Sequence, residues 1–377
     1  MDFSLTDDRR MVADTLSRFL RDSYGPELRN KIAHDGPGYA LEIWAKMAEL
    51  GIVGALVPEA AGGFGGSGFD IAVVFEELGR ALAVEPFLAT GVLGARLIAT
   101  AGGPAELVEA ALAGEQQLAL AHYEPTSRYD LSHVRTRAVM DGDGWRLDGV
   151  KAVVYGGGAA ERLVVSARTS GSDDAADGLT LFLVDPEATG VRRRAYPMID
   201  GAAAADIWLD GVVVGPDAVL GTVDDGFALL EETIAAGALA LSAEALGAME
   251  TAKDMTVAYL RDRKQFGRPI GSFQALQHRA VEMVIEIEQV RSAVIRAASL
   301  LDGERTERER AVSAAKSLVG RVGKRVAEEC IQLHGGIAMT WEYPLGHYAK
   351  RIIMIDHQLG DSDHHLDRFV TLGRAGA

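Results

Sequence analysis

The sequence predicts an α+β protein of three domains: an N-terminal α-helical domain over 1–117, a β domain over 118–220, and a C-terminal four-helix bundle over 221–377. Three observations carry this prediction. Apolar residues first recur at helical spacing, then short β-branched segments separated by turn residues follow, and long alanine- and leucine-rich segments come last. A chain of 377 residues is long enough for two or three packed units.

The N-terminal domain is predicted from short helical segments. "TDDRRMVADTLSRFLRDSY" begins at Thr6, an N-cap candidate that is followed by acidic residues. "ALEIWAKMAELG" ends on Gly51, a residue type that commonly terminates helices. "FDIAVVFEELGRAL" and "FLATGVLGARLIATAGG" continue the series.

The β domain is predicted from a change of pattern after Gln117. The segments "LALAHYE", "RTRAVMDGDGWRLDGVKAVVYGGG", "RLVVSART", "LTLFLVD" and "ADIWLDGVVV" are short and rich in β-branched residues. Asp-Gly, Gly-Gly or proline separates them, as in a meander or a barrel-like sheet.

The C-terminal bundle is predicted from long helical stretches. No proline occurs between Pro216 and Pro269, and we expect one very long helix that ends near Phe266. Three further helical stretches follow: "FQALQHRAVEMVIEIEQVRSAVIRAASLL", "RERAVSAAKSLVGRVGKRVAEECIQLHGG" and "LGHYAKRIIMIDHQLGDSDHHLDRFVTL". Four long helices with short connections are typical of a bundle.

The composition excludes several classes of protein. A net charge of -16 argues against a nucleic-acid binder, so any phosphate site must be local. The single Cys330 excludes an internal disulfide and a multi-cysteine metal centre, and its apolar helical context predicts a packed thiol. The start of the chain has no signal-peptide pattern, and no apolar run is long enough to span a membrane. We therefore expect a cytoplasmic protein.

The stretch "DRKQFGRPIGSFQALQH", Asp262 to His278, is a candidate nucleotide site, referred to below as the elbow. Arg263 and Lys264 offer donors for phosphate oxygens, Gln265 offers an amide, and Phe266 offers a flat face. The alternative is structural: the two cations would complement the dipole of a helix end, and Phe266 would cap the core.

Two other motifs are weaker by themselves. In "QLHGGIAMT", from Gln332 to Thr340, the glycine pair would let exposed backbone approach a ligand, although glycine also ends helices without any ligand. In "DSDHH", Asp361 to His365, a metal site is disfavoured because adjacent helical residues point in different directions. The G-x-S-x-G motif that carries the nucleophile of a triad hydrolase does not occur in the sequence.

Taken together, four segments resemble the acyl-CoA dehydrogenase family over essentially the whole chain: "PEAAGGFGGSGFDIAVVFEELGRAL", "DGDGWRLDGVKAVVYGGGAAERLVVSAR", "YLRDRKQFGRPIGSFQALQHRAVEM" and "QLHGGIAMTWEYPLGHYAKR". Within the family, the sequence is similar to small subunits of the pimeloyl-CoA dehydrogenase type. The resemblance implies the family fold, in the domain order already predicted from periodicity. It also implies a large dehydrogenase subunit as partner and an electron-transferring flavoprotein as acceptor.

The resemblance implies that the chain binds FAD across a subunit contact. The elbow would meet the diphosphate and adenosine part of the FAD of a neighbouring subunit, and the glycine motif would line the same dinucleotide. The residues implied are Arg263, Gln265, Phe266, Gln277, Gln332, Gly335 and Gly336.

The reaction implied is α,β-dehydrogenation of an acyl-CoA thioester, in which a base removes the α proton and the β hydrogen leaves as hydride to the flavin. The sequence departs from the family at the base. Leu359 stands where many members have Glu, and Gly237 stands where another branch has it. Glu244, two turns along the same helix face, and Asp361 are the candidates, and the third alternative is that this chain has no base.

The flavin end departs as well. Tyr123 and Tyr155 stand where the family usually has small hydroxyl residues, which implies a narrowed or partial flavin site. Two alternatives to a dehydrogenase therefore stay open: a non-catalytic partner that completes the FAD site of a larger subunit, and a flavin-dependent monooxygenase of the same fold.

Overall fold

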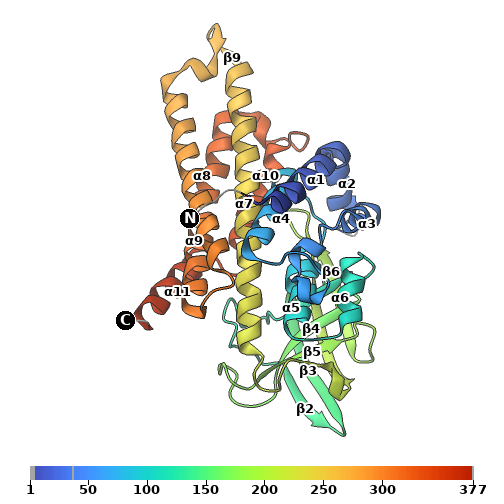
Figure 1. Cartoon of the computed structure of the whole chain (residues 1–377). Helices are drawn as coiled ribbons and strands as arrows, with labels where there is room; N and C mark the ends of the chain where they lie inside the picture. The colour runs from blue at the N-terminus through green and yellow to red at the C-terminus, as the bar shows by residue number, and fades with distance from the viewer. Residues whose placement is uncertain (1–4, 36–37, 376–377) are drawn as a thin grey trace. The chain divides into compact units, whose positions relative to one another are not determined.

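The computed structural model describes residues 5–35 and 38–375, and the chain divides into two compact units. The first comprises Met1–Arg29, Ser67–Ala83 and Ala238–Ala377, and the second comprises Asn30–Gly66 and Val84–Gly237. Each unit thus draws on more than one of the three predicted domains. Figure 1 shows the elements of both units.

The first unit is helical. Its elements are α1 (Asp7–Ser23), α4 (Gly68–Ala81), most of α7 (Phe227–Asp262), a hairpin of β9 (Lys264–Gln265) and β10 (Arg268–Pro269), η5 (Ile270–Ser272), α8 (Gln274–Leu300), α9 (Arg305–His334), η6 (Gly335–Met339), α10 (Leu345–Asp356) and α11 (Ser362–Ala375). The side chain of Thr6 accepts from the Arg9 N–H, so the predicted N-cap is confirmed. Helix α2 (Pro26–Asp35) begins in this unit and ends in the other.

Close packing of α4 on α7 depends on glycine. A Cβ on Gly79 would lie 2.0 Å from the carbonyl oxygen of Glu244, and a Cβ on Gly247 would lie 2.0 Å from that of Glu76. Only residues without a side chain allow this approach, which holds the Glu244 segment of α7 directly against α4.

The second unit holds the sheet and the remaining short helices. The helices are α3 (Leu41–Glu49), η1 (Gly54–Leu56), η2 (Glu59–Ala61), the π-helical η3 (Phe87–Arg96), α5 (Leu97–Thr100), α6 (Ala105–Leu112) and η4 (Pro216–Ala218). Gly51 follows α3 with φ of 78°, in agreement with the predicted helix end. The strands are β1 (Leu118–Ala121), β2 (Arg137–Asp141), β3 (Gly144–Tyr155), β4 (Arg162–Arg168), β5 (Leu179–Val184), β6 (Val191–Pro197), β7 (Ala203–Val214) and β8 (Val219–Leu220).

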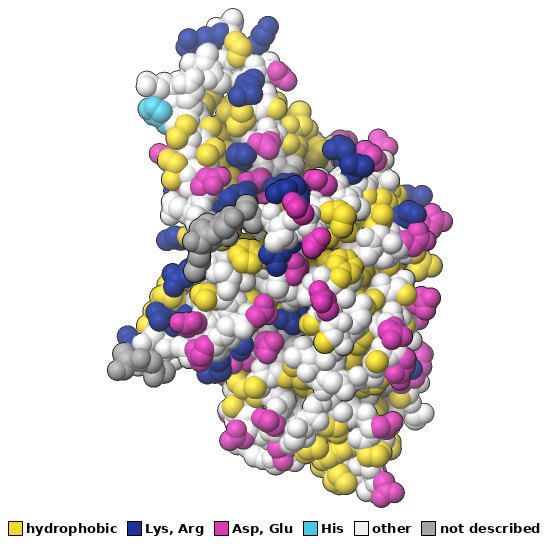
Figure 2. Space-filling view, viewed as in Figure 1, with side chains coloured by type: hydrophobic (Ala, Val, Ile, Leu, Met, Phe, Trp, Pro, Cys, Tyr) yellow, Lys and Arg dark blue, Asp and Glu magenta, His cyan; other side chains and the backbone are white. Residues whose placement is uncertain are grey.

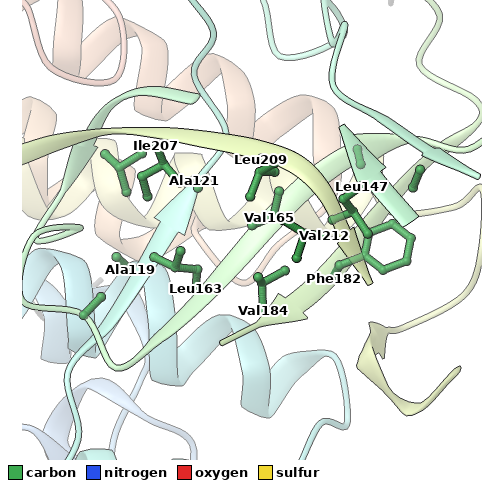
Figure 3. Close-up of a cluster of buried hydrophobic side chains, with 14 residues drawn as sticks. Ala119, Ala121, Leu147, Leu163, Val165, Phe182, Val184, Ile207, Leu209 and Val212 are labelled. Atoms are coloured by element: carbon green, nitrogen blue, oxygen red, sulfur yellow. The ribbon is translucent and has the colours of Figure 1, made fainter. Parts of the chain in front are cut away.

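The strands form one eight-stranded sheet in the order β6-β7-β3-β2-β4-β5-β8, with β1 paired in parallel to β4. Asp141 pairs with Gly144, so the Asp-Gly signal marks a hairpin as predicted. Side chains from six of the strands meet in the apolar core drawn in Figure 3, which includes Leu163, Phe182 and Ile207, all with 0% exposure. The predicted fold class is therefore confirmed.

Two helix ends differ from the prediction. Helix α7 ends at Asp262, short of Phe266, because Phe266 and Gly267 both have positive φ and turn the chain back as a hairpin. The last predicted helical stretch is two helices, since Leu359 and Gly360 also have positive φ, of 54° and 107°. Periodicity alone does not reveal such breaks.

Candidate functional site

The elbow is a hairpin that connects α7 to α8 (Figure 1). Gln265 pairs with Arg268 across a two-residue turn at Phe266 and Gly267, with φ of 51° and 77°. The hairpin is tied to the end of α7 at Arg263, whose N–H donates to the Tyr259 carbonyl at 2.8 Å and whose carbonyl accepts from the Ile270 N–H at 2.8 Å. The candidate residues therefore lie on a short hairpin whose first residue is fixed to α7 and to η5 by backbone hydrogen bonds.

The elbow side chains face solvent in the isolated chain. Phe266 is 89% exposed, and Arg263, Lys264 and Gln265 are exposed as well. Basic side chains gather over this end of the first unit (Figure 2). The alternative in which Phe266 caps the core is wrong. Phe266 is the most exposed of the large apolar side chains in the described residues.

The exposed ring of Phe266 contacts Phe273, and Phe273 in turn contacts Arg268. Phe266 meets Phe273 edge-to-face, with centroids 6.1 Å apart, and the Arg268 guanidinium lies 4.1 Å from the centroid of the Phe273 ring. Phe273 therefore contacts both the turn and the second strand of the hairpin.

The glycine motif follows the end of α9. Gly335 has φ of 69°, and a Cβ on Gly335 or Gly336 would meet nothing within 4 Å, so the backbone here is open to a ligand. Gln332 is exposed one turn earlier. The Gln277 side chain, in the first turn of α8, donates to the Gly271 carbonyl at 2.8 Å, which ties its amide nitrogen to η5.

Glu244 is both buried and paired. Its exposure is 4%, and its two carboxylate oxygens accept from Nε and Nη2 of Arg351, each at 2.6 Å. Nη1 of Arg351 donates to the Gln358 side chain at 2.9 Å, which links the pair to the loop after α10. This bidentate pair fixes the orientation of the carboxylate and uses one lone pair on each oxygen, so Glu244 can take a proton from a substrate only through its remaining lone pairs or after the pair rearranges.

Asp361 begins α11. Its Oδ1 accepts from the His364 N–H at 2.8 Å, as an N-cap carboxylate does, and its side chain is half-buried. Leu359, two residues earlier, is 2% exposed. In the described part of the chain no group of three or more His, Cys, Asp or Glu residues has the arrangement of a metal site.

Lys316 was missed by sequence reasoning. Its ammonium is fully buried in α9 and donates to the carbonyl oxygens of Gly360 at 2.6 Å and Asp356 at 3.0 Å, so it holds the loop between α10 and α11. Burial lowers the pKa of Lys316 from 10.5 to about 7. The available signal was a lysine within the small-residue run "AVSAAKSLVG".

We expect Lys316 to make the free energy of unfolding depend on pH. Between about pH 7 and 10.5 the unfolded chain holds this proton and the folded chain releases it, so stability rises with pH by about 1.4 kcal/mol per unit from this group. Urea unfolding from pH 7 to 10 should show this component in the wild-type protein and lose it in Lys316→Met. The exposed Lys324→Met, on the same helix, is the control. An unchanged slope in Lys316→Met would contradict the assignment.

Tyr123 and Tyr155 belong to the second unit, whereas the other candidate residues belong to the first. Tyr155 ends β3 and is 9% exposed. Tyr123 follows β1, is half-buried, and its ring lies 4.0 Å from that of His122 and 6.5 Å from that of Tyr129, between centroids.

The segment that carries Tyr123 is firmly held. Glu124 accepts from the backbone N–H groups of Arg135 and Thr136 at 2.8 and 2.9 Å and from the Lys151 ammonium at 2.8 Å. Burial alone would raise the pKa of Glu124, but Lys151 and the other donors lower it overall. Burial lowers the pKa of Lys151 to about 8. Glu124 thus ties the segment with Tyr123 to β3 and to the backbone that enters β2.

The donor set of the first unit fits a dinucleotide. A diphosphate needs cationic donors, which Arg263 and Lys264 supply, and an adenine needs a flat apolar face, which Phe266 supplies. The open backbone at Gly335 and Gly336 leaves room for the ligand to approach.

Comparison with known proteins assigns the chain to a family. The N-terminal, middle and C-terminal domain models of acyl-CoA dehydrogenase match residues 6–108, 119–212 and 224–368. Cyclohex-1-ene-1-carbonyl-CoA dehydrogenase of Geobacter metallireducens is 30% identical over 343 residues, which cover 88% of this chain and 89% of the relative. The caffeyl-CoA reductase-Etf complex subunit CarC of Acetobacterium woodii is 28% identical over 348 residues, 90% of each chain.

A solved structure agrees with these matches. The ChsE4-ChsE5 complex from Mycobacterium tuberculosis contains a chain that superposes with a TM-score of 0.89 at 26% identity, over 100% of both chains. No helix in the described ranges is long and apolar enough to cross a membrane. The chain therefore belongs to the acyl-CoA dehydrogenase family, whose members are FAD-binding oxidoreductases that act on CH–CH groups.

Proposed function

We propose that this chain is an FAD-dependent acyl-CoA dehydrogenase subunit that acts in the α,β-dehydrogenation of an acyl-CoA or dicarboxyl-CoA thioester, as the smaller partner of a heteromer of the pimeloyl-CoA dehydrogenase type. The observation that carries the proposal is that the Phe266 side chain is exposed to solvent beside the exposed Arg263 and Lys264. An aromatic side chain that is 89% exposed in the isolated chain gains burial only when a ligand or a neighbouring subunit covers it.

FAD supplies the hydride acceptor when bound, and the residues of this chain bind and orient it. Arg263 would donate two parallel hydrogen bonds to phosphate oxygens, Lys264 would add a compact positive charge, and Gln265 would add an amide. Phe266 would offer its face to the adenine, and the turn at Gly335 and Gly336 would offer backbone to the same dinucleotide. In the second unit, Tyr123 and Tyr155 would be the residues at the flavin end.

The α proton requires a base, and the candidates in this chain are already engaged. The Glu244 carboxylate is paired with Arg351, and the Asp361 carboxylate caps α11. This favours a heteromer in which the larger subunit contributes the base. It also keeps a second candidate function open, in which the chain completes the FAD site of the larger subunit and catalyses nothing alone. No observation on the described residues favours a monooxygenase.

The relatives support the partner assignments. One structural relative is a complex of two named chains, and one sequence relative is a subunit of an Etf complex. By analogy, this chain would pair with a large acyl-CoA dehydrogenase subunit and deliver electrons to an electron-transferring flavoprotein, in the cytoplasm.

The test is the visible spectrum of the purified chain, alone and co-expressed with a candidate large subunit. We expect a flavin spectrum from the pair that is bleached when an acyl-CoA is added. If the chain alone is yellow and reduces an artificial acceptor with acyl-CoA, the heteromer is not needed. If neither preparation holds flavin, the proposal is wrong.

A further inference from the structure

His334 is the last residue of α9 and directly precedes the glycine turn. It is 4% exposed, although it adjoins the exposed residues Gly335 and Gly336. A buried imidazole next to an open loop needs partners on its surrounding elements, and three are present.

Both ring nitrogens of His334 are engaged. Nδ1 lies 2.9 Å from the Cys330 carbonyl oxygen, and Nε2 lies 3.1 Å from the Tyr343 hydroxyl. A carbonyl only accepts, so Nδ1 carries the hydrogen, and in the neutral ring Nε2 accepts from the hydroxyl of Tyr343. The ring also stacks on Tyr259 of α7, with centroids 4.5 Å apart and planes 25° apart.

The stack links the two candidate binding elements. The carbonyl of Tyr259 accepts from the Arg263 N–H at 2.8 Å, where the elbow begins. On the other side, His334 is bonded directly to Gly335 in the chain. One path from the elbow to the glycine turn therefore runs through the aromatic contact between Tyr259 and His334.

We infer that His334 is a positioning residue, which through Tyr259 and Tyr343 fixes the glycine turn relative to the elbow so that both can contact one dinucleotide. This inference rests on the proposed function. It does not require His334 to touch FAD. The open space at Gly335 and the exposed elbow are useful together only if the distance between them is constant.

The neutral ring is the form that fits this site. The ring is contacted by Tyr259 from α7, by Tyr343 from the segment before α10, and by the backbone carbonyl of Cys330 on α9 itself. Burial lowers the pKa of His334 below its ordinary 6.5. Stability from the buried neutral ring is therefore complete above pH 6.5 and is lost as the pH falls further.

The experiment measures FAD binding to the purified protein, with the large subunit present if it is required, between pH 5.5 and 8. Tyr343→Phe removes only the hydroxyl that donates to Nε2, and His334→Phe keeps a ring for stacking but removes both hydrogen bonds. We expect Tyr343→Phe to weaken FAD binding about five- to tenfold at pH 7.5, the size of one hydrogen bond, and His334→Phe, which loses two, to weaken it at least as much. The wild-type affinity should fall where His334 of the folded protein takes up a proton, which its lowered pKa places on the acid side of 6.5, and this fall should be absent in His334→Phe.

Tyr348→Phe is the matched control. Tyr348 is a buried tyrosine of the same unit, and its hydroxyl donates to the Arg80 carbonyl at 2.5 Å without contacting His334. It should lower thermal stability and leave the FAD affinity and its pH profile unchanged. If Tyr343→Phe does no more than this control, or if His334→Phe keeps the wild-type pH profile, the inference is wrong while the proposed function stands. If the wild-type protein binds no FAD with or without the large subunit, both fail.

Discussion

Replacing Arg351 by Met is expected to lower the free energy of unfolding by about 3–5 kcal/mol, because it leaves the Glu244 carboxylate buried without its counter-ion. The side chains of Arg351 and Glu244 are 11% and 5% exposed, and two hydrogen bonds of 2.6 Å join them. Urea unfolding at pH 7 measures the loss. The substitution also removes the bond to Gln358, so the loop after α10 should become more accessible to hydrogen exchange.

The control is an arginine whose ion pairs are exposed. Arg325 pairs with Glu282 at 2.8 Å and with Glu286 at 3.0 Å on the surface of α8 and α9, and Arg325→Met should cost less than about 1 kcal/mol. The double variant Glu244→Gln and Arg351→Met should recover much of the loss, since it removes the buried charge altogether. Equal losses in the two single arginine variants would contradict the assigned role of the buried pair.

The same pair decides the question of the base. Glu244→Gln removes the carboxylate while keeping its shape, and full dehydrogenase activity in that variant would exclude Glu244 as the base. A loss of kcat that Arg351→Met does not share, once both proteins are shown to be folded, would instead support it. A base must be ionised and free to accept a proton, and the ion pair satisfies only the first requirement.

The second large effect is expected at the elbow. Arg263→Ala should weaken FAD binding by about 10- to 100-fold, as the loss of a charge-assisted contact to phosphate does. The Arg263 side chain is exposed in the isolated chain, so its removal should change the free energy of unfolding by less than about 0.5 kcal/mol. Fluorescence titration with FAD at several salt concentrations measures the affinity, and the salt dependence should be weaker in the variant because one phosphate contact is missing.

Arg321→Ala is the control for the elbow. Arg321 is an exposed arginine on α9 of the same unit, away from the elbow in sequence, and its removal changes the net charge by the same amount. If both variants bind FAD equally well, Arg263 does not contact the dinucleotide. If both weaken binding equally, the effect is a general one of charge.

Local features of the sequence determined much of the fold. Thr6 and Gly51 mark helix ends through chemistry that involves only a few neighbouring residues, and Asp-Gly at 141 and 142 marks a hairpin in the same way. The three regimes of periodicity gave the order of helices, strands and helices, and four ordered motifs gave the family.

The tertiary structure alone decided the state of the candidate site residues. Glu244 and Arg351 are 107 positions apart, and no pattern in either segment indicates that they pair. The hairpin turn at Phe266 uses a positive φ at a bulky residue, a conformation that sequence rules assign to glycine or asparagine, so the sequence leaves open whether Phe266 caps the core or contacts a ligand.

The physical reason is one of range. Helical and strand periodicities, caps and turns are set by residues within a few positions of one another, and the sequence by itself determined these, together with the family. Ion pairing, burial of a lysine such as Lys316, and the stack of His334 on Tyr259 depend on which distant surfaces meet. Only the folded chain brings those surfaces together, so only the tertiary structure decided which charged side chains are paired and which are exposed to solvent.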